Sequence, residues 1–332
     1  MTDGEMTTTT TLVTGATGFL GPHLVWEAAA TGPVVAVDRR EPDVDVRAFL
    51  DRDSPRARRV TWATADVTDY DALVRVTRDH PITHVIHAAA ITPDAAMENA
   101  GMRQTVAVNV LGTANALDLA RARAVQRTLV FSSAAVYAHN DGAPLTEDAP
   151  WRDAGAYATS KQSIERLMAH AVNGFGMDVV AVRPSALFGH LERPTGAREA
   201  MSGIYGLMHG AQRGEEMRIH DDGLTRDLTA ASEVARAVVL LLHAPRLSYR
   251  VYNLATGRGY TASEIRDALR IAIPRVRWQF VPPDQATMTL GSNVRTGRLA
   301  VARLHADLGL RLDDDLAAHL TTYHAWLQAH PY

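Results

Sequence analysis

A short apolar run passes directly into three evenly spaced glycines, and this junction limits the possible fold more than any other stretch of the chain. Thr11–Thr14 has the composition of a buried strand, and Gly15-Ala-Thr-Gly18-Phe-Leu-Gly21 follows at once. Glycines allow a tight turn and bring the backbone close to a ligand. An amphipathic stretch comes next, and the free amides at a helix N-terminus attract an anionic group such as a pyrophosphate. Strand, turn and helix therefore predict a dinucleotide-binding unit, with cofactor contacts from Gly15, Thr17, Gly18, Phe19, Leu20 and Gly21.

The first half of the chain alternates short apolar runs with longer amphipathic stretches, a pattern typical of βαβ units around a parallel sheet. The expected strands are Thr11–Thr14, Val34–Val37, Val60–Thr64, His84–His87, Arg127–Ser132 and Asp178–Arg183. The expected helices are Phe19–Ala30, Tyr70–His80, Gly101–Ala122 and Ala154–Asn173. The pattern predicts an α/β fold with a doubly wound parallel sheet and right-handed crossovers.

After about Pro184 the rhythm changes. Residues 184–228 are richer in Gly, Arg and His and predict loops with one or two helices. Beyond them we expect strands at Val251–Leu254 and Val276–Val281, and helices at Ser232–His243, Ala262–Ile273 (with Thr261 as N-cap) and Asp313–Ala329. We expect a disordered tail at 1–9, a dinucleotide-binding domain with the catalytic residues at 10–183, and a smaller, mainly substrate-binding α/β part at 184–332.

Composition excludes several kinds of protein. The 332 residues carry a formal net charge of −3, so no excess of positive charge favours nucleic acid or an anionic membrane as partner. There is no cysteine, which excludes disulfides, thiolate metal sites and cysteine nucleophiles. No apolar run is long enough for a membrane span, and the polar N-terminus lacks the features of a secretion signal. The histidines have no metal-ligand spacing, so we expect no metal, and we expect a cytoplasmic protein.

The acidic residue that ends the second strand bears on the choice of cofactor. Asp38 closes Val34-Val-Ala-Val-Asp38, where a carboxylate accepts hydrogen bonds from the adenosine ribose and repels a 2′-phosphate. Arg39 and Arg40 follow, and an arginine there could hold that phosphate instead. We expect NAD, with NADP as the less favoured alternative.

Tyr157-Ala-Thr-Ser-Lys161 places a phenol and an ammonium group on one face of a predicted helix. A neighbouring cation favours a phenolate and lowers the pKa of the phenol, which can then exchange a proton with a substrate alcohol. The spacing alone is common on solvated helices. Because this pair follows a predicted dinucleotide-binding loop, we interpret it as a catalytic pair.

Together these motifs resemble the extended short-chain dehydrogenase/reductase family, the group of nucleotide-sugar epimerases, dehydratases and related dehydrogenases. The resemblance covers about residues 11–329 and implies a Rossmann-type fold. It implies that Ser133 positions the reacting alcohol, that Tyr157 is the acid/base, and that Lys161 binds the nicotinamide ribose and lowers the Tyr157 pKa. Further cofactor contacts implied by it are Arg39, Asp66, Val67, Ala88, Ala89, Ala90, Asn109 and Pro184.

The resemblance also implies a substrate side, with two departures. Arg226 of Thr225-Arg-Asp-Leu228 matches an arginine that reaches a nucleotide-sugar diphosphate, although a surface ion pair between Arg226 and Asp227 is the alternative. Arg295 or Arg298 is expected to supply a second arginine, and the other expected substrate contacts are Thr92, Ser133, Ala134 and Ser185. Ser185 and His190 stand where the family has Asn and Pro, which puts a nucleotide-sugar substrate in question.

We expect NAD-dependent epimerisation of a nucleotide sugar, or of another polyhydroxy compound, through a keto intermediate. The alternatives are a net dehydrogenase or reductase of a sugar, sugar acid or other hydroxy compound and, more remotely, a non-catalytic nicotinamide sensor. Dehydration is disfavoured, because Ala134 and Ala135 replace the Asp-Glu pair of the family's dehydratases. A homodimer through Gly101–Ala122 and Ala154–Asn173 is expected.

Overall fold

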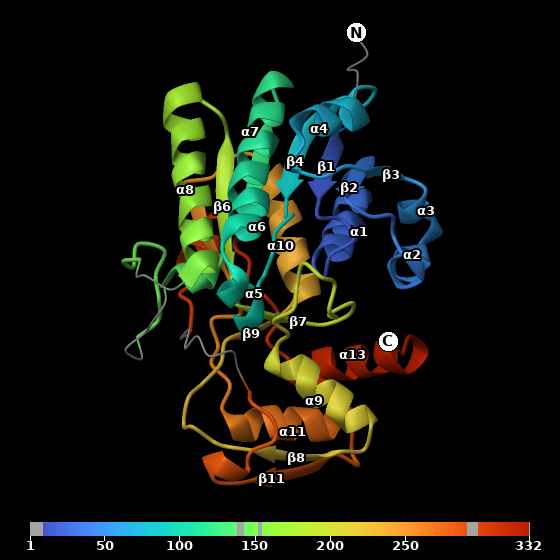
Figure 1. Cartoon of the computed structure of the whole chain (residues 1–332), viewed down its shortest axis with the longest axis vertical. Helices are drawn as coiled ribbons and strands as arrows, with labels where there is room; N and C mark the ends of the chain where they lie inside the picture. The colour runs from blue at the N-terminus through green and yellow to red at the C-terminus, as the bar shows by residue number, and fades with distance from the viewer. Residues whose placement is uncertain (1–8, 138–142, 152–154, 291–297, 332) are drawn as a thin grey trace.

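Seven parallel strands form the central sheet, in the order β10-β6-β5-β4-β1-β2-β3 (Figure 1). The computed structural model describes residues 9–137, 143–151, 155–290 and 298–331, so nearly all of the predicted N-terminal tail lies outside the described residues. The strands are β1 Thr10–Thr14, β2 Val34–Asp38, β3 Val60–Thr64, β4 Ile82–His87, β5 Arg127–Phe131, β6 Val179–Pro184 and β10 Val251–Leu254. The strand order reverses beside β1, and the carboxyl ends of the strands open a crevice at that point. The predicted fold class is confirmed.

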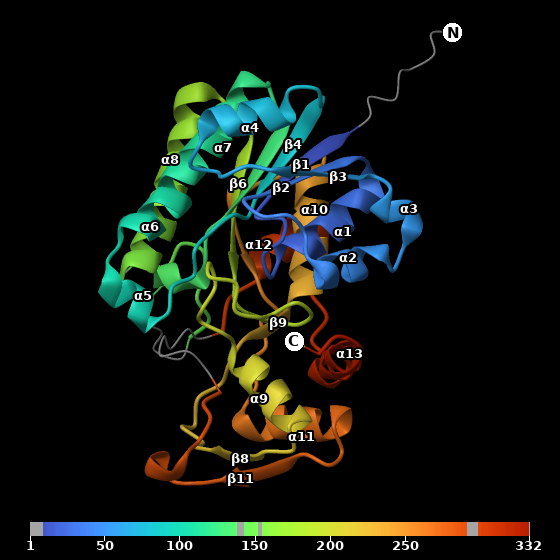
Figure 2. The same ribbon diagram turned by 45° about the vertical axis from the view of Figure 1, so that its right-hand side comes forward.

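Helices cover both faces of this sheet, as Figure 2 shows. One face carries α4, α7 and α8 over apolar side chains such as Leu12 and Val130, and the other carries α1 and α10 over side chains such as Val13 and Val180. Nearly every strand residue is buried in β1, β5 and β6, as expected for a parallel sheet enclosed on both sides. The helices are α1 Gly21–Thr31, α4 Tyr70–Thr77, α7 Gly112–Ala122, α8 Gly155–Phe175 and α10 Ala231–His243.

The long helix predicted at Gly101–Ala122 is interrupted. The structure has α6 (Arg103–Val106), then one π-helical turn, η1 (Ala107–Leu111), and then α7. The predicted start of the next helix, Ala154, lies outside the described residues. Before α6 the chain forms a short helix that was not predicted, α5 (Ala95–Ala100), capped by the Asp94 side chain.

Much of the C-terminal part lies below the sheet, seen in yellow to red in Figure 1, although one of its helices, α12 (Ala302–Leu308), packs on β10 of the sheet. Helix α11 begins as predicted at Thr261, whose hydroxyl and Glu264 form a reciprocal capping box. The predicted terminal helix begins three residues late, because Asp315 caps it. The elements are β7 Ala186–Phe188, α9 Gly203–Gln212, β8 Glu216–Ile219, β9 Leu228–Ala230, α11 Ala262–Ala272, β11 Arg277–Phe280, η3 Pro283–Gln285, α12 Ala302–Leu308 and α13 Leu316–Ala329.

The predicted boundary at 183/184 does not follow the sheet. Strand β10 comes from the C-terminal half, yet it pairs with β6 and completes the sheet at that edge. Helix α10 packs on α1, and Arg127 of β5 caps its C-terminus by donating to the carbonyls of Leu241 and Ala244. The two halves of the chain therefore share one central layer.

Two further helices, α2 (Val44–Asp51) and α3 (Ser54–Ala57), lie between β2 and β3 and were not predicted. Asp43 caps α2 and Asp53 caps α3, so both begin at an ordinary N-cap signal. No helix within the described ranges is both long and apolar enough to cross a membrane.

Candidate active site

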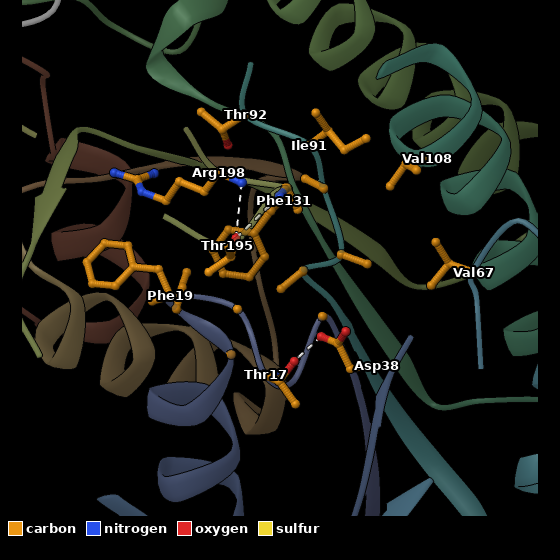
Figure 3. A pocket seen from close by; sticks show the side chains of 18 of the residues that line it. Thr17, Phe19, Asp38, Val67, Ile91, Thr92, Val108, Phe131, Thr195 and Arg198 are labelled. Atoms are coloured by element: carbon orange, nitrogen blue, oxygen red, sulfur yellow. Dashed lines mark hydrogen bonds between the residues drawn. The ribbon is translucent and has the colours of Figure 1, made fainter. Parts of the chain in front are cut away.

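A cleft opens at the carboxyl ends of the strands, between the glycine loop and a loop from the C-terminal part (Figure 3). Most of the predicted cofactor residues line it. They are Gly15, Thr17, Gly18, Phe19, Leu20, Gly21, Asp38, Arg39, Asp66, Val67, Ala88, Ala89, Ala90, Tyr157, Lys161 and Pro184. The lining also includes Arg40 and Ser132, the neighbours of the predicted contacts Arg39 and Ser133. The other lining residues were given no role from the sequence, namely Ala65, Ile91, Val108, Phe131, Leu187, Thr195, Ala197 and Arg198.

The glycine loop requires its first and third glycines. Gly15 has φ +72°, and a Cβ there would lie 2.7 Å from the Ala89 backbone. A Cβ on Gly21 would lie 2.1 Å from the carbonyl oxygen of Gly15. Any side chain at either position would force the first strand, the fourth strand and helix α1 apart. The loop is thus held close to Ala89, with the N-terminus of α1 facing the cleft.

Asp38 is fixed at the opposite end of the loop from Phe19, as Figure 3 shows. Its Oδ2 accepts a hydrogen bond of 3.0 Å from the Thr17 amide, which ties the end of β2 to the glycine loop. One carboxylate oxygen remains for the hydroxyl groups of a ribose. Arg39 lines the same end of the cleft, whereas the Arg40 guanidinium donates to the carbonyl of Thr195 at 2.8 Å.

Asn109, a predicted cofactor contact, makes its side-chain hydrogen bonds inside the protein. Its Oδ1 accepts from the Ile91 amide at 2.8 Å, and its Nδ2 donates to the Ile91 carbonyl and to the Ser160 hydroxyl. The residue is fully buried and lies outside the cleft lining. It ties the end of β4 to α8, the helix that carries Tyr157.

Tyr157 and Lys161 lie one turn apart on α8 and both line the cleft. The Lys161 ammonium lies 5.6 Å from the centre of the Tyr157 ring and donates to the carbonyl of Phe131 at 2.8 Å. Burial lowers the pKa of Lys161, and attraction to a Tyr157 phenolate partly offsets this. The arrangement places a half-buried phenol beside a buried cation at the cleft.

The two serines after β5 have different surroundings. Ser132 is buried and its hydroxyl donates to Glu165, a residue of α8 one turn beyond Lys161. Glu165 in turn forms a buried ion pair with Arg183, with 2.6 Å between Nη2 and Oε2. Ser133 is half-buried, and its oxygen accepts from the Ala135 amide at 3.1 Å, which leaves the hydroxyl proton for another acceptor. Ser132 therefore lines the cleft with its hydroxyl already paired to Glu165, whereas Ser133 lies outside the cleft lining with its hydroxyl proton uncommitted.

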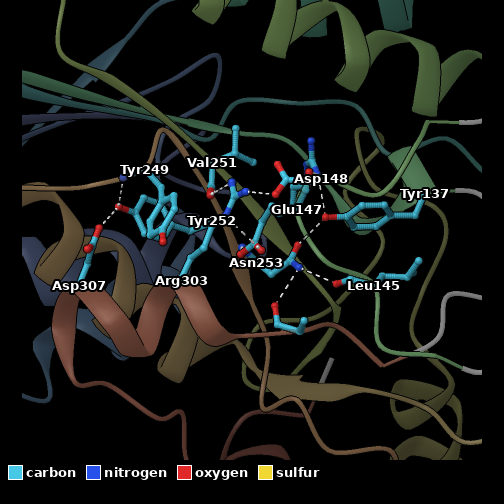
Figure 4. Close-up of polar contacts among 12 residues, drawn as sticks. Tyr137, Leu145, Glu147, Asp148, Tyr249, Val251, Tyr252, Asn253, Arg303 and Asp307 are labelled. Atoms are coloured by element: carbon cyan, nitrogen blue, oxygen red, sulfur yellow. Dashed lines mark hydrogen bonds and ion pairs between the residues drawn. The ribbon is translucent and has the colours of Figure 1, made fainter.

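The Arg183 ion pair continues into a polar network under β10, part of which Figure 4 shows. Arg183 donates to the hydroxyl of Tyr137, which donates to Asn253 at 2.8 Å. Asn253 also donates to the carbonyls of Leu145 and Ala300. The side-chain amide of Asn253 is therefore fully hydrogen-bonded within the protein.

The residues predicted to contact substrate are less closely grouped. Thr92 lines the cleft, while Ser185 lies behind Pro184 with its hydroxyl 2.8 Å from that of Thr229. Arg226 forms an ion pair of 2.7 Å, but with Asp222 and not with Asp227. Arg298 is exposed and Ala134 is buried, and neither lines the cleft. Arg295 lies outside the described residues.

His190, the second departure from the family pattern, belongs to another cluster. Its ring stacks on Trp326 of α13 at 5.3 Å and its Nε2 lies 3.2 Å from the carbonyl of Thr322. Burial lowers its pKa to about 4, so the ring is neutral and packs as an aromatic group. In the part of the chain that the structure describes, no group of three or more His, Cys, Asp or Glu side chains could hold a metal ion.

A segment from the region that the sequence predicted as loops crosses the cleft, and we call residues 193–199 the strap. Arg193 forms ion pairs with Asp43 and Asp45. At its other end the strap pairs with Thr92, whose amide donates to the carbonyl of Ala197 at 2.7 Å. The sequence showed only that residues 184–228 are rich in Gly, Arg and His, because a loop without a motif gives no signal of where it lies.

Comparison with known proteins places the chain among enzymes of one family. Residues 11–255 match the model of the NAD dependent epimerase/dehydratase family. UDP-glucuronate 4-epimerase of Thermodesulfobacterium geofontis (strain OPF15) is 28% identical over 261 residues, covering 74% of this chain and 75% of that protein.

Solved structures show the same architecture. UDP-glucose-4-epimerase from Stenotrophomonas maltophila, with bound NAD and formylated UDP-arabinopyranose, superposes with a TM-score of 0.82 at 24% identity, covering 97% of this chain and 98% of that one. MoeE5 in complex with UDP-glucuronic acid and NAD has a TM-score of 0.76 at 26% identity, covering 96% and 99%. With the family match spanning well over half of its length, this chain belongs to the NAD dependent epimerase/dehydratase family.

Proposed function

We propose that the chain is an NAD-dependent epimerase that inverts a ring hydroxyl of a nucleotide sugar, with carbon 4 of a UDP-hexose or UDP-uronate as the reacting centre. The observation that carries the proposal is the joint presence of Tyr157, Lys161 and the glycine loop in a single cleft. The relative and the solved structures named above act on or bind UDP-sugars, which supports this substrate class.

The cleft suits a dinucleotide. Gly15 and Gly21 let the loop pack closely on Ala89 and on its own backbone, and the N-terminal end of α1 lines the cleft, where its amides could bind a pyrophosphate. Asp38 supplies the acceptor for ribose hydroxyls and repels a 2′-phosphate, which favours NAD over NADP. Lys161 would hold the nicotinamide ribose, and Pro184 would lie near the nicotinamide.

The proposed reaction uses the chain's own groups for proton transfer. When bound, the nicotinamide accepts a hydride from the alcohol carbon and returns it. Ser133 donates a hydrogen bond to the reacting oxygen, and Tyr157 takes the hydroxyl proton. The ammonium of Lys161 attracts the charge that develops on the phenol oxygen. After the keto sugar turns over, Tyr157 returns the proton as hydride reaches the opposite face.

The neighbours of Ser133 argue against dehydration. Elimination of water from a sugar needs an additional acid and base beside the tyrosine. Ala134 is buried against Val136 and Ala255, and Ala135 is half-buried, so two methyl groups occupy these positions. Neither alanine can transfer a proton, so Tyr157 of α8 is the proton-transfer group that we propose for this site.

We further propose a homodimer through α6–η1–α7 and α8. Met102, Val106 and Leu111 are exposed by 62%, 42% and 47% along the first of these helices. Large apolar side chains gathered along one helix indicate a surface that is covered by a partner. A second copy of the chain would bury them against the same surface.

Replacing Tyr157 with Phe tests the proposed chemistry. The variant keeps the ring and loses the hydroxyl that exchanges the proton, so turnover of the UDP-sugar should fall by about 100-fold or more while cofactor binding persists. Tyr70→Phe, a tyrosine of α4 outside the cleft lining, is the matched control and should keep full activity. Turnover near that of wild type in Tyr157→Phe would remove this residue from the mechanism.

A further inference from the structure

Arg198 is a cation at the cleft mouth that neither the glycine motif nor the Tyr157–Lys161 pair accounts for. It lines the cleft, and its guanidinium carbon lies 4.9 Å over the ring of Phe19 in the glycine loop. Figure 3 shows the two side chains together, on the side of the cleft away from Asp38 and Val67. The positive charge of Arg198, a residue of the C-terminal part, thus lies next to the glycine loop just before α1.

The guanidinium is held in place from behind. Its Nη2 donates to Glu192 at 2.9 Å, and this carboxylate is fully buried. Glu192 also accepts from the amide and the hydroxyl of Ser202, each at 2.7 Å. The Arg198 side chain is therefore already ordered in the folded protein, so ligand binding costs less side-chain entropy.

Not every donor of the Arg198 guanidinium is paired in the part of the chain that the structure describes. The Nε–H of Arg198 is buried and has no hydrogen-bond partner among the residues that the structure describes. A buried donor without a partner is costly, and it is stabilised when a ligand supplies the acceptor. The position over Phe19, beside the first-turn amides of α1, is where a dinucleotide pyrophosphate is bound in this fold.

Backbone contacts of the strap hold Arg198 in position opposite the glycine loop. Thr92 forms a parallel bridge to Arg198, and the Arg198 amide donates to the Thr195 hydroxyl at 3.1 Å. At the other wall Arg40 donates to the Thr195 carbonyl. The strap is therefore attached to both walls of the cleft, with Arg198 facing the glycine loop.

We propose that Arg198 is a phosphate-binding residue that contacts the pyrophosphate of the dinucleotide from the side opposite the glycine loop. This inference rests on the proposed function for the identity of the cofactor. Arginine suits the role, because its planar fork stays charged and can bind Glu192 and phosphate oxygens at once. The C-terminal part of the chain then contributes directly to holding the cofactor.

Calorimetry with four ligands tests the proposal on the full chain after any retained cofactor has been exchanged out. The ligands are NAD, ADP-ribose, adenosine and UDP. In Arg198→Met the aliphatic stem can still pack on Phe19, and affinity for NAD and ADP-ribose should fall about tenfold or more. Affinity for adenosine, which has no phosphate, and for UDP should not change.

Arg193→Gln is the matched control, since it removes one charge from the same strap at a position outside the cleft lining. It should bind all four ligands as wild type does, and thermal unfolding should show both variants folded. Unchanged ADP-ribose affinity in Arg198→Met would overturn the proposal. If Arg198→Met weakened only the binding of UDP, Arg198 would instead contact the substrate diphosphate. If Arg193→Gln lost as much affinity for ADP-ribose as Arg198→Met, the effect would come from the position of the strap and not from the Arg198 guanidinium. A wild-type protein that binds neither NAD nor ADP-ribose would instead contradict the proposed function.

Discussion

At the scale of single residues, the contacts of Ser132 and Lys161 support Ser133 and Tyr157 as the candidate reactive groups. The family resemblance selects Ser133 over Ser132, and the structure adds that Ser132 is buried and donates to Glu165. The sequence gives no sign of that contact, because Glu165 lies 33 positions away in the chain. Tyr157, Lys161 and Glu165 occupy successive turns of α8, so one helix carries the phenol, the cation and the anchor of the serine segment.

This anchor leads to a prediction about stability. Glu165→Ala leaves Arg183 in the core without its carboxylate, and the free energy of unfolding should fall by about 3–5 kcal/mol. Denaturant unfolding monitored by circular dichroism measures it. Glu215→Ala, which breaks an exposed pair with Arg213, is the control and should leave the midpoint unchanged. A Glu165→Ala midpoint equal to that of the control would show that the buried pair does not support the serine segment.

At the scale of secondary-structure elements, most of the regular framework could be predicted. Every strand of the central sheet and the helices that cover it were expected, because short β-branched runs and amphipathic stretches carry strong periodic signals. The π-helical turn at Ala107–Leu111 was not, since it depends on Asn109 reaching Ile91 and Ser160 across the fold. Short helices such as α2 and α3 were missed for lack of length.

The same helix pair gives the prediction about assembly. Leu111→Glu places a charge on the exposed face of the π-helical turn, and burial of an unpaired charge in a dimer contact is unfavourable. We expect a dimer for wild type and a monomer for this variant by light scattering. Ile271→Glu, at an apolar position on α11 that is 68% exposed against 47% for Leu111, is the control and should remain dimeric. A monomeric wild type would contradict the proposed contact.

At the scale of the whole molecule, the site is completed by parts that come from both halves of the chain. The glycine loop, Asp38 and the Tyr157–Lys161 pair could be predicted, because each has a local spacing with a chemical reason. The strap and Arg198 could not, because their position depends on Thr92, Arg40 and Glu192 meeting them in space. Arg226 shows the converse case, since a sequence match placed it at the substrate and the structure pairs it with Asp222.

The most direct test of the central claim is a reaction with a single UDP-sugar and no added alcohol or reductant. Purified protein, supplied with NAD, is given UDP-glucose or UDP-glucuronate. Products are identified by nuclear magnetic resonance, and the near-ultraviolet absorption band of NADH is recorded throughout. Our account predicts that one of these sugars is converted to its 4-epimer and that the same equilibrium mixture is reached from either epimer, with no net NADH. Steady accumulation of NADH in step with an oxidised product would contradict epimerisation and identify a net dehydrogenase.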